Sequence, residues 1–306
     1  MTPQPQDKPK LALIGHGEAG QALAQGWREA GVAHGLSAFD IEPARSLAPD
    51  RAGALDGAAA VFCLVTADSA AQALKQAAPF LPAGALVFDG NSCAPRTKRE
   101  NAELVARAGA RYVDMAIMAP VHPRLHRTPV LLSGEHAREA AEMLAALDMV
   151  AEVVEGPVGA ASSVKMIRSV MVKGLEALSA ECLLAARRAG VADRVIDSLE
   201  HSHPGLALAA RGGYNLERML VHGSRRAAEM REVVKTLDDL GLSGAMSAAS
   251  ADWQERLGGL GLTPVDGDWR ALADAILKAL PQGAGEMPAP GKGKPPETAQ
   301  SLSKVR

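Results

Sequence analysis

The sequence predicts an α/β Rossmann domain followed by an all-α domain. Short apolar segments typical of strands alternate with helical patterns from Lys10 to about Glu155, whereas only helical patterns follow Gly159. Aromatic residues make up 3% of the 306 residues, and Ala, Leu, Val and Gly supply the core instead. This composition favours closely packed helices and parallel strands over an all-β sandwich.

The first half contains seven predicted strands, each a run of apolar or β-branched residues bounded by turn residues. These strands are 11–15, 36–40, 59–65, 85–89, 111–118, 128–134 and 149–154. Helical patterns occur between them at 18–30, 69–77, 97–109 and 135–147. Because strands and helices alternate, we expect right-handed βαβ units on a mostly parallel sheet.

The second half is predicted to contain long helices only, at about 160–190, 193–201, 215–241, 243–257 and 268–280. The turn sequence GPVG at 156–159 separates the two halves, so we expect domains at 8–157 and 158–280. The tail 281–306 is rich in Pro, Gly and Lys, which predicts disorder.

The composition also narrows the classes of partner and location. A net charge of −2 and a pI near 6.5 indicate neither a nucleic acid nor a membrane partner. The three cysteines lack CxxC spacing, which predicts reduced thiols. Since residues 1–10 contain no apolar signal core and no run of about 18 apolar residues occurs, we expect a cytoplasmic protein.

A glycine-rich turn follows the first predicted strand. Its residues Gly15, His16, Gly17, Glu18, Ala19 and Gly20 match GxGxxG between a strand and a helix. The glycines permit close backbone approach, and the helix N-terminus attracts a pyrophosphate. Asp40, twenty residues beyond Gly20, is placed to accept hydrogen bonds from an adenosine ribose. We therefore predict a dinucleotide site rather than a merely structural turn. Asp40 and Glu42 would repel a 2′-phosphate, which favours NAD, while nearby Arg45 keeps NADP as the alternative.

A second candidate site lies on the helix that opens the second half. Its polar stripe consists of Lys165, Ser169, Val172 and Glu176, flanked by Arg168 and Lys173. A helix that is apolar on its other faces is normally buried, and burying unpaired cations is costly. We therefore expect the stripe to face a polar cleft, the alternative being a surface face with extended lysines.

Together these features resemble the β-hydroxyacid dehydrogenase superfamily, which includes 6-phosphogluconate dehydrogenase and 3-hydroxyisobutyrate dehydrogenase. The resemblance runs from Leu11 to about Gly241 and is greatest to a bacterial branch of the superfamily. The loop 88–92, FDGNS, resembles a family loop and implies that Asn91 and Ser92 bind substrate. Cofactor contacts are implied for Val65, Thr66 and Asn91. The segment 159–165 resembles the family segment that ends in the catalytic lysine, which implies that Lys165 transfers a proton.

The sequence also departs from the superfamily pattern. Arg168 and Ser169 stand where relatives carry an Asn, so we expect both to bind substrate, with a salt bridge as the alternative role of Arg168. The segment DMAIMAP at 114–120 replaces a Ser-Gly-Gly loop, with Met115 and Met118 as predicted substrate contacts. Val172 replaces the acidic residue of 6-phosphogluconate dehydrogenases, which argues against phosphogluconate decarboxylation.

The leading hypothesis is an NAD(P)-dependent oxidoreductase that moves hydride between nicotinamide and a small β-hydroxy acid or its keto or semialdehyde form. The alternatives are an imine or bulky-ketone reductase and a non-catalytic dinucleotide-binding regulatory protein. We expect a small-molecule substrate with a carboxylate, no metal site, a homodimer formed through the helical half, and pairing of Lys173 with Glu176.

Overall fold

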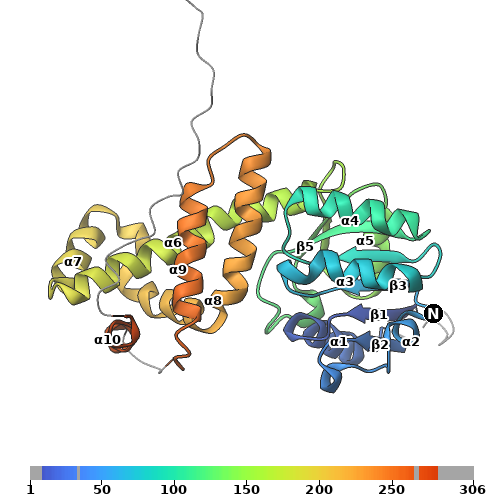
Figure 1. Cartoon of the computed structure of the whole chain (residues 1–306), viewed down its shortest axis with the longest axis horizontal. Helices are drawn as coiled ribbons and strands as arrows, with labels where there is room; N and C mark the ends of the chain where they lie inside the picture. The colour runs from blue at the N-terminus through green and yellow to red at the C-terminus, as the bar shows by residue number, and fades with distance from the viewer. Residues whose placement is uncertain (1–8, 33–34, 265–268, 282–306) are drawn as a thin grey trace, which may run out of the picture.

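The structure, a computed structural model, describes residues 9–32, 35–264 and 269–281. A sheet flanked by helices forms one half and a group of helices forms the other (Figure 1). Helix α6 (Ala160–Arg188) begins beside the sheet and runs through the helical half. The tail predicted to be disordered lies outside the described residues from position 282 onward.

Seven strands form one sheet in the order β2-β1-β3-β4-β5-β6-β7. Only the β5–β6 pair is antiparallel within the described sheet, and every other neighbouring pair is parallel. The strands are β1 (Lys10–Ile14), β2 (Gly35–Phe39), β3 (Ala60–Cys63), β4 (Leu86–Asp89), β5 (Arg111–Ile117), β6 (Val130–Ser133) and β7 (Ala151–Val153). The predicted Rossmann sheet followed by helices is confirmed.

Alternate residues of the strands pack on opposite faces of the sheet, as the period of two requires. Leu11 and Leu13 share a core with helices α1 (Glu18–Ala30) and α5 (Ala137–Ala146). On the other face, Ala12 and Ile14 pack under three more helices. These are α2 (Arg51–Leu55), α3 (Ala70–Ala77) and α4 (Pro95–Arg107). Both faces are covered, so the carboxyl ends of the strands remain as the open edge.

The helical half contains α6, α7 (Ala192–Ser202), α8 (Leu208–Asp239), α9 (Ala245–Gly258) and α10 (Trp269–Ala279). Helix α8 begins at Leu208 rather than near 215, because Gly212 is a close packing position and not a helix breaker. A Cβ at Gly212 would lie 2.8 Å from Leu183 Cδ1, so the glycine lets the Leu183 side chain of α6 pack directly on α8. None of the described helices combines the length and hydropathy that a membrane span needs.

Helix α6 contradicts the expectation that its apolar faces are buried. Its polar residues Ser169, Lys173 and Glu176 are only 5–6% exposed. Its apolar residues are instead 36–63% exposed along one face, defined here as the apolar seam: Val164, Ile167, Met171, Leu175 and Leu178. The described chain therefore buries these three polar side chains of α6 and leaves the apolar seam accessible.

Candidate active site

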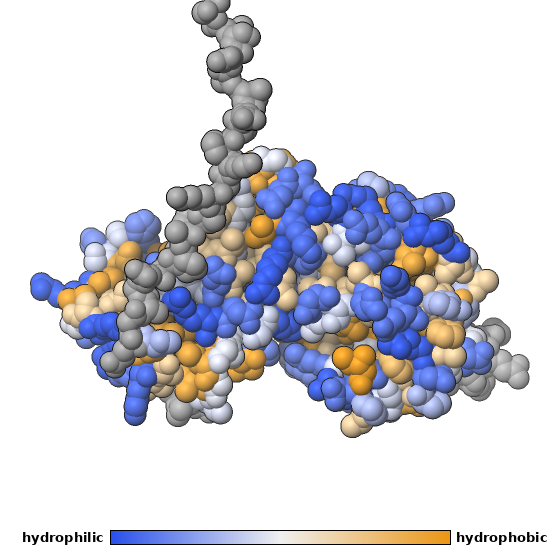
Figure 2. All heavy atoms as spheres, in the orientation of Figure 1, coloured by the Kyte–Doolittle hydropathy of each residue, from blue (hydrophilic) through white to orange (hydrophobic). Residues whose placement is uncertain are grey.

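A cavity of about 1050 Å³ lies between the two halves, at the carboxyl ends of β1, β3 and β4. Figure 2 shows the notch between the halves, with hydrophilic side chains around it on this face. The order β2-β1-β3 places the strand-order reversal at β1 and β3, where ligands bind in open parallel sheets. Helices α6 and α8 and the loop 117–121 form the opposite wall.

The glycine-rich turn has the geometry that a dinucleotide requires. Gly15 has φ +91°, and a Cβ there would lie 2.4 Å from the carbonyl oxygen of Leu64. A Cβ at Gly20 would lie 2.5 Å from the carbonyl oxygen of Gly15, so α1 packs closely under the turn. At Gly17 the nearest atom to such a Cβ is Arg45 Nη1 at 3.9 Å, which leaves the loop open on its cavity side. A pyrophosphate fits against this open backbone and the α1 N-terminus.

Asp40 lies beside the turn at the end of β2 and lines the cavity. Its Oδ2 accepts a hydrogen bond from the His16 N–H at 2.7 Å, and its Oδ1 accepts one from the Glu42 N–H at 2.9 Å. Each carboxylate oxygen carries two lone pairs, so acceptor capacity remains for a ribose hydroxyl. Arg45 also lines the cavity, and its carbonyl oxygen lies 2.6 Å from His16 Nδ1.

Lys165 extends from α6 into the cavity from the helical wall. Burial, together with the charges of Lys173, Lys98 and Arg225, lowers the pKa of its ammonium to about 8 against the opposing effect of Glu229. A lysine with this pKa exchanges a proton readily near neutral pH. Lys165 forms no ion pair with any residue that the structure describes.

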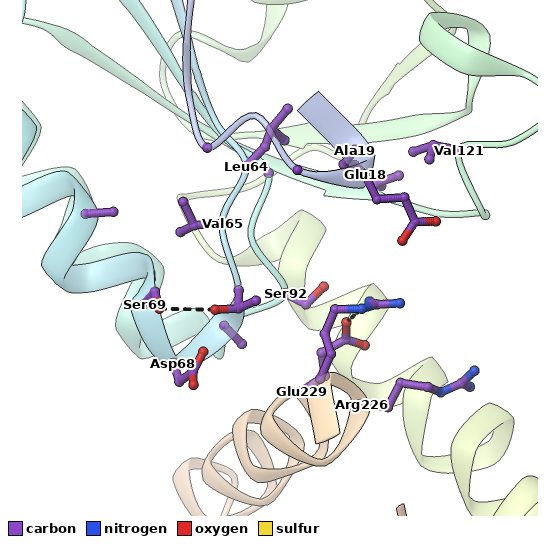
Figure 3. A pocket seen from close by; sticks show the side chains of 18 of the residues that line it. Glu18, Ala19, Leu64, Val65, Asp68, Ser69, Ser92, Val121, Arg226 and Glu229 are labelled. Atoms are coloured by element: carbon purple, nitrogen blue, oxygen red, sulfur yellow. Dashed lines mark hydrogen bonds and ion pairs between the residues drawn. The ribbon is translucent and has the colours of Figure 1, made fainter. Parts of the chain in front are cut away.

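Acids from α8 and α6 neutralise three of the other cations on this wall. Glu229 lies 2.8 Å from Lys173 Nζ and 2.6 Å from Arg225 Nη1, while Glu176 lies 2.5 Å from Arg226 Nη2. Burial raises the pKa of Glu229, but Lys173 and Arg225 outweigh it and hold the pKa at about 2. Figure 3 shows Glu229 and Arg226 facing Glu18, Val65 and Ser92 across the cavity.

The predicted pairing of Lys173 with Glu176 is therefore wrong. Both side chains point toward α8 rather than toward each other along α6, because α8 offers each a partner of opposite charge. Gln254 of α9 donates a further hydrogen bond to Glu176 at 3.1 Å. The polar stripe of α6 thus faces the cleft and the α6–α8 interface together.

The chain matches two family models in succession along its length. Residues 10–159 match the NAD binding domain of 6-phosphogluconate dehydrogenase, and residues 186–257 match a domain of unknown function (DUF1932). A conserved hypothetical protein from Sinorhizobium meliloti 1021 is 36% identical, with a TM-score of 0.69 over 89% of this chain and 97% of that one. The chain belongs to the 6-phosphogluconate dehydrogenase-like family and carries its NAD(P)-binding domain.

Other members and neighbours share this architecture. The conserved protein MTH1747, whose structure is described as similar to 3-hydroxyacid dehydrogenases, is 25% identical with a TM-score of 0.60 over 83% of this chain and all of that one. An uncharacterised 28.5 kDa protein of Methanothermus fervidus is 26% identical over 175 residues. The matched part is 57% of this chain and 66% of the length of that relative. A reductive aminase from Aspergillus terreus, 20% identical with a TM-score of 0.52 over 88% and 99% of the chains, shows the fold alone.

Most of the site residues predicted for this chain line the cavity between the two halves. They are Gly15, Gly17, Glu18, Ala19, Asp40, Val65, Thr66, Ser92, Met118, Lys165, Arg168 and Ser169. His16 and Gly20 lie just behind this surface, where the backbone N–H of His16 holds Asp40 and Gly20 packs on Gly15. The two ends of the predicted site, far apart in sequence, thus meet across the cleft.

Two predicted contacts are not supported by the structure. Met115 is fully buried in the sheet core, where the end of its side chain packs beneath Gly90. Asn91 is 3% exposed, with its Oδ1 accepting from the Val65 N–H at 2.7 Å and its Nδ2 donating to Asp89 Oδ1 at 2.7 Å. Asn91 therefore holds the loops that present Val65 and Ser92, while its own side chain faces inward.

Several residues of the helical wall and of the sheet were not predicted from the sequence. Ile117, Tyr214, Arg218 and Glu229 line the cavity, and a buried cluster of Asp89, Lys98 and Asp114 lies directly below it. One signal was available for the cluster. Asp89 and Asp114 each follow apolar strand residues and lie opposite each other on β4 and β5, and buried neighbouring acids require a cation. The positions on α8 have no comparable local pattern.

Proposed function

We propose that the chain is an NAD(P)-dependent oxidoreductase that moves hydride between nicotinamide and a small β-hydroxy acid or its keto or semialdehyde form. The observation that carries this proposal is Lys165, a lysine with a pKa near 8 that faces the glycine-rich turn across the cleft. The bound cofactor supplies the hydride chemistry, and the chain supplies the turn, the carboxylate of Asp40 and the proton-transfer group.

In this mechanism Lys165 accepts the hydroxyl proton during oxidation and returns it during reduction. Arg168, one turn further along α6, is exposed in the cavity and donates only a long 3.5 Å contact to the Met118 carbonyl. It has no acidic partner in the described part of the chain, so its guanidinium remains available to bind a substrate carboxylate in two-pronged fashion. Ser169 already donates to the Lys165 carbonyl and accepts from Lys173, which assigns it to fixing Lys173.

NAD is the cofactor that we favour over NADP. Asp40 and Glu42 line the part of the cavity next to the turn, where a 2′-phosphate of NADP would meet two negative charges. Arg45 and Arg51 line the same region, and their positive charges would favour a 2′-phosphate. The guanidinium of Arg51, however, already stacks on the Phe39 ring at 4.3 Å. Isothermal titration measures the preference directly, and tenfold tighter binding of NADPH would reverse it.

Reduction of an imine or a bulky ketone is the second candidate. One wall of the cavity is largely apolar, which suits a substrate with hydrocarbon bulk. It is formed by the segment 117–121, Ile-Met-Ala-Pro-Val. The structural likeness to a reductive aminase supports the same alternative at the level of fold. Arg168 favours the first candidate, because a neutral imine gives a guanidinium no anion to bind.

We also propose that two copies of the chain associate through the apolar seam of α6. The five side chains of the seam recur at helical spacing along α6, and their exposure of 36–63% is unusual for large apolar residues on one face. A symmetric pairing of two α6 helices would remove both seams from water at once.

The test is a screen of NADH and NADPH oxidation against ketoacids, semialdehydes and cyclic imines. Turnover of ketoacids or semialdehydes, together with a higher KM for them in Arg168→Ala, supports the first candidate. Turnover confined to imines or bulky ketones supports the second. Tight cofactor binding without turnover of any class would contradict both and favour a regulatory dinucleotide-binding protein.

A further inference from the structure

Asp114, in the middle of β5, caps the helix that carries Lys165. Its Oδ2 accepts hydrogen bonds from the N–H groups of Gly159 at 3.1 Å and Ser162 at 3.0 Å, and from the Ser162 hydroxyl at 3.1 Å. The Ser133 hydroxyl adds a fourth at 3.0 Å and itself accepts from the Ala161 N–H at 2.9 Å. The first turn of α6 is therefore held by β5 and β6, both of which belong to the sheet half.

A buried cation lies beside the carboxyl group of Asp114. Lys98 Nζ lies 3.1 Å from Asp89 Oδ1 and 3.5 Å from Asp114 Oδ1, and all three side chains are fully buried. Burial alone lowers the pKa of Lys98, but Asp89 and Asp114 raise it to about 12. Lys98 thus links Asp89 to Asp114, whose carboxyl group faces the positive, N-terminal end of the α6 dipole.

Glu232, in the helical half, caps a helix of the sheet half in the same way. It lies on α8, is 5% exposed, and its Oε2 accepts from the Ala94 N–H at 2.8 Å and from the Thr97 hydroxyl at 3.1 Å. Ala94 is the N-cap residue of α4, which packs on the sheet. The loop before it contains Ser92, which lines the cavity. Each half of the chain thus supplies a buried carboxylate to the first turn of a helix that borders the other half.

We propose that Asp114 and Glu232 are positioning residues that together fix the distance across the cleft between Lys165 and the cofactor-side loop at 90–94. Lys165 follows the capped residue Ser162 by less than one helical turn, so displacement of the helix start moves its ammonium. The geometry of proton and hydride transfer depends on that distance, because misplacement by about 1 Å costs on the order of a hundredfold in rate. The kinetic part of this inference rests on the proposed function, whereas its structural part does not.

Two variants test it, Asp114→Asn and Glu232→Gln, with Ser162→Ala as a milder form of the first. Asp50→Asn is a matched control, because Asp50 caps α2 through the Gly53 N–H at 2.8 Å and lies outside this interface. Ser163→Ala is the second control, since its hydroxyl donates only to the Gly159 carbonyl at 2.7 Å in the same turn. Melting temperatures confirm that each variant is folded.

The first measurement needs no substrate. Spin labels at cysteines introduced at the exposed positions Lys75 and Glu217, in a chain with Cys182→Ala, report the distribution of distances across the cleft. We expect one narrow distribution in the parent chain and both controls, and roughly doubled widths in Asp114→Asn and Glu232→Gln. Hydrogen exchange should rise roughly tenfold at 160–164 in the first variant and at 95–98 in the second. Unchanged widths in both variants would overturn the proposal.

The second measurement is kinetic, with the substrate found by the screen. We expect kcat to fall on the order of tenfold to a hundredfold in both variants, while KM and the NADH Kd stay within about threefold. The controls should keep kcat within about twofold. Wider distance distributions with unchanged kcat would overturn the positioning role and leave two structural caps. Failure of the whole screen would overturn the proposed function, and the distance measurement would still decide whether the caps fix the cleft.

Discussion

The two faces of α6 differ in a way that reverses the usual arrangement of a globular helix. One face buries Ser169, Lys173 and Glu176 at 5–6% exposure, and the other leaves Met171 63% exposed and Leu178 58% exposed. The polar face is buried because α8 presents Glu229 and Arg226 at ion-pair distance. No described element covers the apolar face. On these two faces, burial follows the presence of a partner helix, whereas Met166 and Leu183 elsewhere on α6 are buried in apolar clusters.

The largest effect is expected at Lys165, on the polar face. Lys165→Met should lower turnover by about 10²–10⁴-fold, the usual contribution of a positioned general acid–base. NADH affinity should change little, because the adenosine and pyrophosphate site lies across the cleft at Gly15–Gly20 and Asp40. Steady-state kinetics measures the turnover, and isothermal titration measures the NADH affinity. Near-normal turnover in this variant would contradict the proposed mechanism but not the fold.

The ion pairs of the polar face should matter more for stability than those at the surface. Glu229→Gln leaves Lys173 and Arg225 without their buried counter-charge, which should cost about 3–5 kcal/mol in the free energy of unfolding. Urea denaturation measures this loss in the free energy of unfolding. Glu217→Gln, an exposed acid on the same helix, is the control and should stay within about 0.5 kcal/mol. Equal losses at the two positions would mean that the buried pairs have no special role.

The low pKa of Lys165 predicts a specific pH dependence. Oxidation requires the neutral amine, so kcat/KM should rise about tenfold per pH unit up to about 8 and then level off, whereas the reduction rate should fall above about 8. Lys173→Met removes a charge that lowers the pKa of Lys165 and should move the midpoint upward. Glu229→Gln removes one that raises it and should move the midpoint downward. A midpoint near the ordinary lysine value of about 10.4 would show that the amine is not desolvated as described.

The smallest effect on a single chain is expected at the apolar seam. Met171→Glu places a charge on an already exposed position, so the free energy of unfolding of an isolated chain should change by less than about 0.5 kcal/mol. If two copies pair through α6, the same change should convert a dimer into a monomer in light scattering. A parent chain that is already monomeric at micromolar concentration would rule out the proposed pairing.

Local patterns carried much of the fold and part of the candidate site. The GxGxxG turn at 15–20 was predictable because strand, turn and helix are adjacent in sequence, and Gly20 packs against the backbone of Gly15 within the same turn. The period of 100° per residue placed Lys165 and Glu176 on one stripe, and the structure keeps that stripe together. Both inferences depend only on residues within a few turns of each other.

The sequence by itself determined the alternation of strands and helices, the phosphate turn and the polar stripe, since these are properties of short segments. Only the tertiary structure decided which acid neutralises which cation, that Met115 points into the core, and which face of α6 is covered. Glu176 and Arg226 are fifty residues apart, and their pairing depends on how α8 is rotated and placed along α6. That placement is set by the sum of many long-range contacts, including Gly212 against Leu183, and no local period encodes it.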